Sequence, residues 1–143
     1  MKPLDLTQHP PRRAGERLDG LVLLPRTIDK LRASLPGGNI GSYKIPGFST
    51  KLLELLGVSE ADMLEAVRTA STDDDVAAWV RAQSDPSKYP KINEHFERRT
   101  VADLADPEDY HRRYPIAKRL GLTRLIDVLD ADDAESFATP KSS

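Results

Sequence analysis

The sequence predicts an all-α fold, a compact single domain of five to seven short helices. Three observations lead to this prediction. Apolar residues recur at spacings of three and four along much of the chain, polar capping motifs precede several of these stretches, and glycine or proline follows them. A chain of 143 residues also has the ordinary length of one domain with its own hydrophobic core.

An irregular N-terminal arm is predicted at residues 1–16, ahead of a helical domain at residues 17–130. Prolines occupy three positions of the arm, and each of them lacks a backbone donor and holds the residue before it extended. The arm also carries Arg12 and Arg13, which are expected only to keep it solvated.

The first helix is predicted between Leu21 and Leu35, where apolar residues form one stripe at alternating spacings of three and four. Pro25 fits either the first helical position or a kink after one turn, and the Pro-Gly-Gly run at residues 36–38 ends the helix. The residues that follow form a loop or, alternatively, a short extended segment around residues 40–46.

Three short helices in succession are predicted in the middle of the chain. The first is capped by Ser49 and ended by Gly57, which suits the left-handed conformation of a helix end. Ser59 and Thr72, each followed three residues later by aspartate, begin the next two helices. Because the joints are short, these helices are expected to pack against one another around one core.

The last third of the chain is more polar, and prolines at positions 86, 90, 107 and 115 mark helix starts or breaks. Gly121 ends one helical piece, and Thr123 is expected to cap a last helix that reaches Leu129. Residues 131–143 are acidic and then small and polar, which predicts a tail whose last residues are disordered.

Several stretches of the chain resemble a known family. They are LDLTQHPPR near the N-terminus, LPRTIDKLRASLPG, the tyrosine at position 43, LLELLGV and the Trp79-Val80 pair. In these stretches, over about the first 85 residues, the sequence is similar to small bacterial proteins of domain of unknown function 5069. The family's charged helix and its leucine-rich helix stand here at Ile28–Arg32 and Leu52–Gly57. The resemblance implies a small, cytoplasmic, mostly helical protein, and it transfers no catalytic residue.

Composition restricts the classes of function. The chain has no cysteine, which excludes disulfides, thiolate catalysis and cysteine-bound metals and agrees with a reducing cytoplasm. No apolar run is long enough for a signal peptide or a membrane-spanning helix. The formal charge of -2 gives no overall attraction to nucleic acid or anionic lipid. We therefore expect a cytoplasmic protein that has no membrane association.

No motif for catalysis is found, so the sequence leaves open whether the protein is an enzyme. Glu108 and His111 have a spacing at which both side chains can reach one metal, but the second copy that a carboxylate-bridged site requires is missing. The glycine-rich turn after the first helix lacks the Gly-Lys-Ser/Thr of a phosphate loop and does not follow a strand. We predict neither a metal nor a cofactor.

The best candidates for a ligand site are cationic and aromatic residues, most of them on the first helix and the loop after it. They are Arg26, Lys30, Arg32, Tyr43, Lys44 and Trp79. Such groups recognise a carboxylate or a phosphate. The alternative reading is structural: Asp29 and Arg32 close an ion pair at the edge of the core, and Trp79 is a core anchor.

Three functions are compatible with these patterns. The first is a non-enzymatic interaction module that presents a groove or surface to a protein partner or to a second copy of itself. The second is a small-molecule binding protein or enzyme whose anion site lies near helix 25–35 and loop 36–48. The third is nucleic-acid binding through residues 98–124, where seven basic residues accompany four acidic ones and two tyrosines. Nucleic acid is not the favoured partner, because these arginines scatter around the predicted helices.

Overall fold

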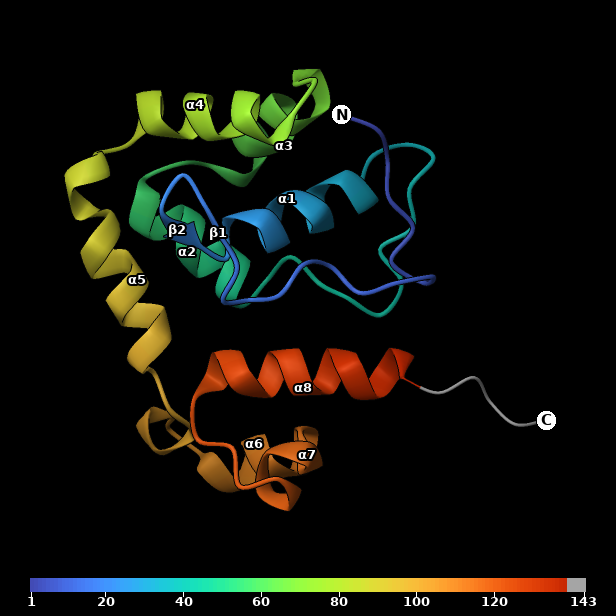
Figure 1. Cartoon of the computed structure of the whole chain (residues 1–143), viewed down its shortest axis with the longest axis vertical. Helices are drawn as coiled ribbons and strands as arrows, with labels where there is room; N and C mark the ends of the chain where they lie inside the picture. Colours follow the sequence, from blue (N-terminus) through green and yellow to red (C-terminus); the bar gives the residue numbers. More distant parts are fainter. Residues whose placement is uncertain (139–143) are drawn as a thin grey trace.

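The computed structural model describes residues 1–138, which are mostly helical (Figure 1). The predicted all-α class is confirmed, although these residues form eight α-helices instead of five to seven, with two 3₁₀ helices and one two-stranded sheet. Within residues 1–138, no helix is both long and apolar enough to cross a membrane. In chain order the elements are β1 (Arg17–Leu18), β2 (Leu21–Val22), α1 (Leu24–Ala33), α2 (Phe48–Leu56), α3 (Glu60–Thr69), α4 (Asp73–Gln83), η1 (Pro86–Lys88), α5 (Tyr89–Arg98), η2 (Val101–Asp103), α6 (Pro107–Arg113), α7 (Pro115–Arg119) and α8 (Leu125–Phe137).

The two strands lie where the apolar stripe predicts the start of the first helix. β1 and β2 pair antiparallel across the turn formed by Asp19 and Gly20. Both turn residues have positive φ, 51° and 80°, and Asp-Gly is a preferred sequence for such a two-residue turn. The local turn signal thus outweighs the first part of the stripe, and α1 begins at Leu24 with Pro25 in its first turn. Of the two alternatives for Pro25, a place at the helix start is confirmed, and a kink after an earlier helical turn is wrong.

The loop after α1 is fastened to the N-terminal arm. No strand forms at residues 40–46 of the described chain, which corrects one of the two alternatives for this loop. Asn39, just before it, makes an isolated parallel bridge with Asp5 of the arm. The arm itself has no regular helix or strand, but Leu6 and Ala14 are buried, so it forms part of the body of the protein.

The first 98 residues, which we call the main body, share one large apolar core. Its buried side chains include Ile28 of α1, Met63 of α3 and Phe96 of α5. The ring of Phe96 also contacts that of Phe48 at the start of α2, with 5.5 Å between the ring centroids. The core therefore joins helices from across the main body.

Helix caps in the middle of the chain largely follow the sequence. The side chains of Ser59 and Thr72 accept hydrogen bonds from backbone amides three residues on, and Gly57 ends α2 with a φ of 73°. Ser49 is not a cap, because α2 already begins one residue earlier. Its hydroxyl is buried instead and lies 2.9 Å from that of Thr27.

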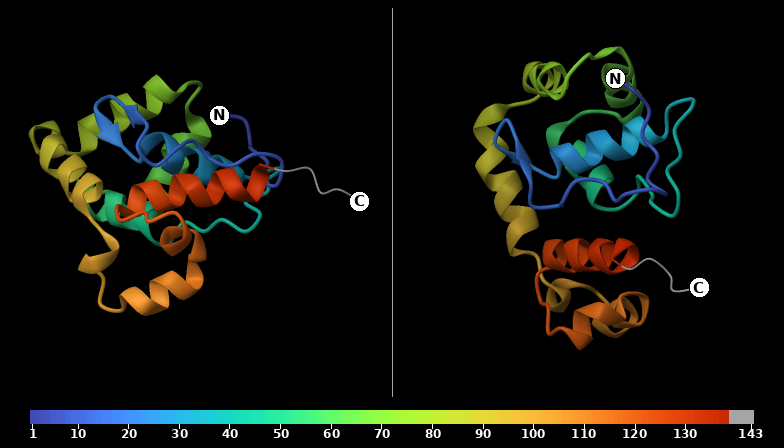
Figure 2. Two further views of the ribbon diagram at one scale, coloured as in Figure 1. Left: turned by 60° about the horizontal axis from the view of Figure 1, so that its bottom comes forward. Right: turned by 45° about the vertical axis from the view of Figure 1, so that its right-hand side comes forward.

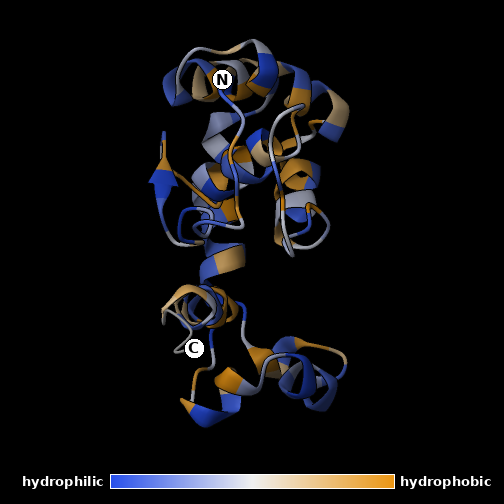
Figure 3. Ribbon diagram, turned by 90° about the vertical axis from the view of Figure 1, so that its right-hand side faces the viewer, coloured by the Kyte–Doolittle hydropathy of each residue, from blue (hydrophilic) through white to orange (hydrophobic). Residues whose placement is uncertain are grey.

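The rest of the described chain forms a C-terminal lobe, residues 99–124 together with the outer face of α8. Figure 2 shows α6 and α7 on the side of α8 that faces away from α1, and Figure 3 shows main body and lobe stacked, with hydrophobic and hydrophilic residues alternating around their helices. α8 belongs to both parts: its residues Ile126 and Leu129 pack on the main core, whereas other residues of the helix pack in the lobe. The lobe has its own small core of Val101, Tyr110, Ile116, Ala117, Leu125 and Val128.

The predicted tail boundary at residue 130 is wrong, since α8 continues to Phe137. The start of the predicted tail is helical, and one of its acidic residues is bound by the main body: Asp133 accepts a hydrogen bond from the Arg26 guanidinium at 2.6 Å. Thr123 does not cap α8, whose N-cap is the following arginine. The predicted disorder of the last residues concerns positions 139–143, which lie outside the described residues.

Candidate functional site

Helix α1 lies at the centre of the main body (Figure 1). Nine of its ten residues are buried, among them Arg26, Asp29 and Lys30. Charged side chains are seldom buried to this degree unless they are paired. The partners of these three residues therefore indicate what each of them does.

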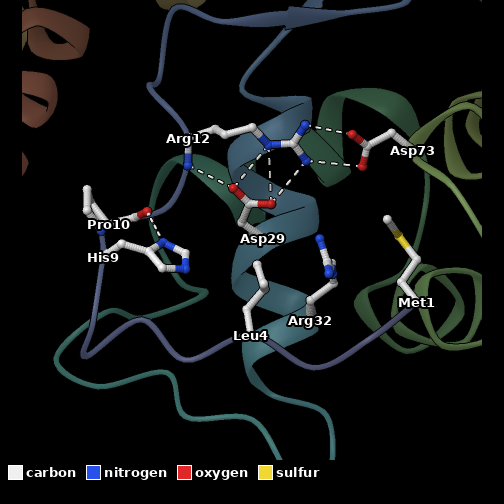
Figure 4. A pocket seen from close by; sticks show the side chains of 8 residues that line it. All are labelled: Met1, Leu4, His9, Pro10, Arg12, Asp29, Arg32 and Asp73. Atoms are coloured by element: carbon white, nitrogen blue, oxygen red, sulfur yellow. Dashed lines mark hydrogen bonds and ion pairs between the residues drawn. The ribbon is translucent and has the colours of Figure 1, made fainter.

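On one side of α1, Asp29 is bound by Arg12 of the arm (Figure 4). The Arg12 guanidinium donates to Asp29 at 3.0 Å and to Asp73, the first residue of α4, at 2.6 Å. The backbone N–H of Arg12 also donates to Asp29, at 2.8 Å. Burial by itself lowers the pKa of Arg12, but hydrogen bonds to Asp73 and Asp29 outweigh burial and raise the pKa above its usual value. Arg12 thus fastens the arm to α1 and α4.

This clamp corrects two expectations. Arg12 does not merely solvate the arm, and Asp29 does not pair with Arg32. The Nε of Arg32 donates instead to the backbone carbonyl of Lys2 at 2.8 Å. Arg12 displaces the same-helix partner because it brings a guanidinium and a backbone amide to the same carboxylate.

An open hollow of about 350 Å³ lies beside the clamp (Figure 4). Its two aspartates are both bound by Arg12, and its two arginines balance their charge. The side chains that line the hollow therefore carry no surplus charge with which to select a ligand, and we interpret the clamp as structural. The residues that line the hollow are Met1, Leu4, His9, Pro10, Arg12, Asp29, Arg32 and Asp73.

On another side of α1 lies a second group of polar residues, Arg26, Lys30, Tyr43 and Asp133, which we call the Lys30 site. Asp133 of α8 accepts hydrogen bonds from the Arg26 guanidinium at 2.6 Å and from the Tyr43 hydroxyl at 2.7 Å. The guanidinium also lies over the Tyr43 ring, 5.6 Å from its centroid. Burial, and then the hydrogen bond to Asp133 and its charge, raise the pKa of Tyr43, so the phenol remains a donor.

Lys30 is the member of the site that lacks a partner. It is 8% exposed, and among the described residues its ammonium makes no hydrogen bond and has no carboxylate within 4.0 Å. Burial and the charge of Arg26 lower the pKa of Lys30 to about 8, although Asp133 opposes them. The buried Nε of Arg26 also has no hydrogen-bond partner in the described chain. At pH 7 the site therefore holds two cations and one carboxylate.

The structure brings together three of the six residues predicted to line a ligand site, namely Arg26, Lys30 and Tyr43. The other three form no hydrogen bond or ion pair with them among the described residues. Arg32 lines the hollow, and Lys44 is exposed and forms no ion pair within the described residues. Trp79 is half-buried and packs on the main core.

Sequence reasoning misses Arg12 and Asp133. A signal for Asp133 exists, because Ile126, Leu129, Asp130 and Asp133 have the spacing of one helical face. That face ends in carboxylates, so its second half has the composition of a tail. For Arg12 the sequence contains no comparable signal, since its two carboxylate partners are 17 and 61 residues away.

The basic segment at residues 98–124 forms no broad cationic surface. Tyr110 is buried, and its ring stacks on that of Tyr114 with 4.8 Å between the centroids. Residues 1–138 also contain no cluster of three or more histidine or acidic side chains that could hold a metal ion. Five of the seven basic residues of the segment form ion pairs: Arg98, Arg112, Arg113, Arg119 and Arg124.

The family of the chain follows from a match to a family model. The model described as domain of unknown function (DUF5069) matches residues 8–135. The chain belongs to this family. The DUF5069 match extends beyond the N-terminal stretches that carry the resemblance and includes both Arg12 and all four residues of the Lys30 site. No curated protein matches the sequence, and the DUF5069 description assigns no activity.

Proposed function

We propose that the protein is a non-enzymatic binding module that recognises a small anion, a carboxylate or a phosphate, at the Lys30 site. The observation that carries the proposal is the buried, unpartnered Lys30 beside the buried Arg26. A largely buried cation that makes no direct ion pair is costly, and a bound anion reduces that cost.

The donors of the site suit such a ligand. Arg26 Nε is fully buried and has no acceptor among the described residues. Lys30 Nζ also makes no hydrogen bond there, but it is not among the fully buried atoms and so keeps some contact with solvent. The two side chains lie one turn apart on α1. Charge-assisted hydrogen bonds from such groups to an anion are stronger than bonds between neutral groups. Asp133 and Tyr43 hold Arg26 in place, so part of the site is ordered before a ligand binds. The small exposed fraction of Lys30 favours a small ligand.

The other two functions have less support. A protein-binding surface usually includes a contiguous apolar patch, but within residues 1–138 the large apolar side chains that are exposed are Leu120 and Phe137. Single exposed residues of this kind are ordinary on protein surfaces. Nucleic-acid binding through residues 98–124 has few free cations available, because most of the arginines there are paired.

We also propose a cytoplasmic location. The support is compositional: the 143 residues contain no cysteine, as is common for proteins of reducing compartments. Fractionation of cells that carry a tagged copy of the protein checks this part of the proposal, and recovery in an extracellular or membrane fraction contradicts it.

Isothermal titration calorimetry with sodium formate, acetate and phosphate tests the proposed anion site. We expect binding to the wild type at pH 7 and a loss of affinity of about tenfold or more in Lys30→Gln, because hydrogen bonds to charged groups contribute about 1.5–3 kcal/mol. The affinity is also expected to fall as the pH rises above about 8, where Lys30 loses its proton.

Lys44→Gln is the matched control, since it removes the same charge from an exposed lysine of the neighbouring loop. It is expected to bind these anions like the wild type. Circular dichroism establishes that each variant is folded. If none of the three anions binds, or if Lys30→Gln binds them as tightly as the wild type, the Lys30 site is not an anion site.

A further inference from the structure

We infer that Asp133 determines which anions the Lys30 site accepts, so that the site binds small monoanions such as carboxylates and rejects dianions such as doubly charged phosphate. This inference rests on the proposed function and adds a ligand class to it. Asp133 is a permanent negative charge of the site, and it limits how much negative charge a bound ligand can add.

Asp133 is held in the site by Arg26 and Tyr43. Its Oδ2 accepts from one Arg26 nitrogen at 2.6 Å, and its Oδ1 accepts from the Tyr43 hydroxyl at 2.7 Å and from the second Arg26 nitrogen at 3.5 Å. It is 6% exposed. Helix α8 is anchored on the same face by Ile126 in the main core and by the bond from Ala14 to Asp130. The carboxylate is therefore fixed in position and is expected to stay there when a ligand binds.

The charge balance of the site follows from this fixed carboxylate. Among the four residues of the Lys30 site, Arg26 and Lys30 are positive and Asp133 is negative, which leaves a surplus of one positive charge while Lys30 is protonated. A monoanion brings the buried group to neutrality, whereas a dianion leaves one uncompensated negative charge. Such a charge is costly where water is largely excluded.

The neighbouring carboxylate Asp132 supports the same conclusion. Burial, and then the charges of Asp133 and Glu135, raise the pKa of Asp132, although Arg26 opposes them. The carboxylates of Asp133 and Glu135 thus disfavour a negative charge at Asp132, and they act in the same direction on a second negative charge of a ligand.

Perchlorate and sulfate test the inference, because both are tetrahedral oxyanions and sulfate carries one more negative charge. Their affinities are measured at equal ionic strength for the wild type and for Asp133→Asn. Binding that persists in Lys30→Gln occurs elsewhere on the protein and is subtracted. Asparagine keeps an oxygen that can accept from Arg26 and Tyr43 and removes the charge. We expect the ratio of sulfate to perchlorate affinity to rise at least tenfold in Asp133→Asn.

Asp132→Asn is the matched control, since it removes an equal charge from the adjacent residue, which makes no hydrogen bond or ion pair with Arg26 among the described residues. The inference is overturned if the ratio of sulfate to perchlorate affinity rises as much in Asp132→Asn as in Asp133→Asn. It is also overturned if that ratio is unchanged in Asp133→Asn. In both cases anion binding at Lys30 still stands. If Asp133→Asn does not fold, tighter Lys30-dependent binding of sulfate than of perchlorate by the wild type overturns it. If no anion binds the wild type or the variant, the proposed function itself fails.

Discussion

The main body and the C-terminal lobe differ in how deeply they bury charged side chains. In the main body, Arg26 and Lys30 are buried on α1, and Arg26 reaches a carboxylate on a helix that is distant in sequence. In the lobe, ion pairs such as Arg113 with Asp109 lie on the surface, and most of them join residues three or four positions apart. The main body also has surface pairs, such as Arg81 with Asp19, but its buried Arg26–Asp133 pair has no counterpart among the ion pairs within the lobe.

The difference matters because burial changes the energy of a charge. Surface ion pairs generally contribute about 1 kcal/mol or less, and salt screens them. Removing one partner of a buried pair typically costs about 3–5 kcal/mol, because the other charge is left without compensation. A buried cation that is left without a partner, such as Lys30, therefore calls for a functional explanation, whereas the surface pairs of the lobe do not.

The largest expected effect comes from Arg26→Met. The substitution leaves Asp133 buried with only Tyr43 as a partner, and we expect a loss of about 3–5 kcal/mol in the free energy of unfolding. Urea denaturation at pH 7, followed by circular dichroism, measures it.

Arg81→Met provides the control for this substitution within the main body. Arg81 pairs with Asp19 at the surface, and its side chain is 51% exposed. We expect its urea midpoint to stay close to that of the wild type. Equal midpoints for Arg26→Met and Arg81→Met would remove the energetic distinction between buried and surface pairs.

Lys30→Met is expected to act in the opposite direction and to stabilise the protein. A lowering of the Lys30 pKa from 10.5 to about 8 corresponds to a cost of about 3 kcal/mol when the lysine is protonated in both states. Methionine fills a similar volume without a charge. Although Lys30→Met is expected to be more stable, its affinity for anions is expected to fall, since the variant loses the proposed ligand contact.

The stability difference between Lys30→Met and the wild type is expected to depend on pH in one direction. Below about pH 8 the folded and unfolded states both hold the Lys30 proton, so the variant has its full advantage there. Between about pH 8 and 10.5 only the unfolded state holds the proton, so the wild type gains stability as the pH rises. The difference in unfolding free energy between variant and wild type should therefore shrink over this range. A difference that is constant from pH 7 to 10.5 contradicts a lowered pKa.

The sequence predicts those features of the fold that depend on neighbours along the chain. Ser59, Thr72 and Gly57 begin or end helices as expected, because each acts on a backbone group within four residues. The hairpin is also local, but its Asp19-Gly20 turn directly precedes an apolar stripe that by itself predicts a helix. Local signals of different kinds thus compete, and the shorter one can prevail.

The candidate site is predictable only in part, because its contacts join distant segments. The sequence identifies Arg26, Lys30 and Tyr43 from their residue types and their proximity along the chain. It does not identify Asp133, which is 107 residues from Arg26 and lies in a segment that reads as an acidic tail. Which carboxylate partners which cation is decided by packing of α8, and that packing is set by apolar residues outside the site.

The smallest effect is expected for Arg113→Gln in the lobe. The hydrogen bond from Arg113 is the main reason why the pKa of Asp109 is lowered. The Arg113 guanidinium also lies 5.6 Å from the centroid of the Tyr110 ring. Because the Arg113 side chain is 60% exposed, we expect a decrease in Tm of about 3 °C or less, together with an Asp109 pKa closer to its usual value. Thermal unfolding and NMR titration measure these two effects, and salt should reduce the first. Arg26→Met should keep its larger decrease at the same salt concentration, because water and ions do not screen a buried pair to the same extent. A decrease in Arg113→Gln that equals that of Arg26→Met and resists salt would mean that the lobe, too, depends on its charges for stability.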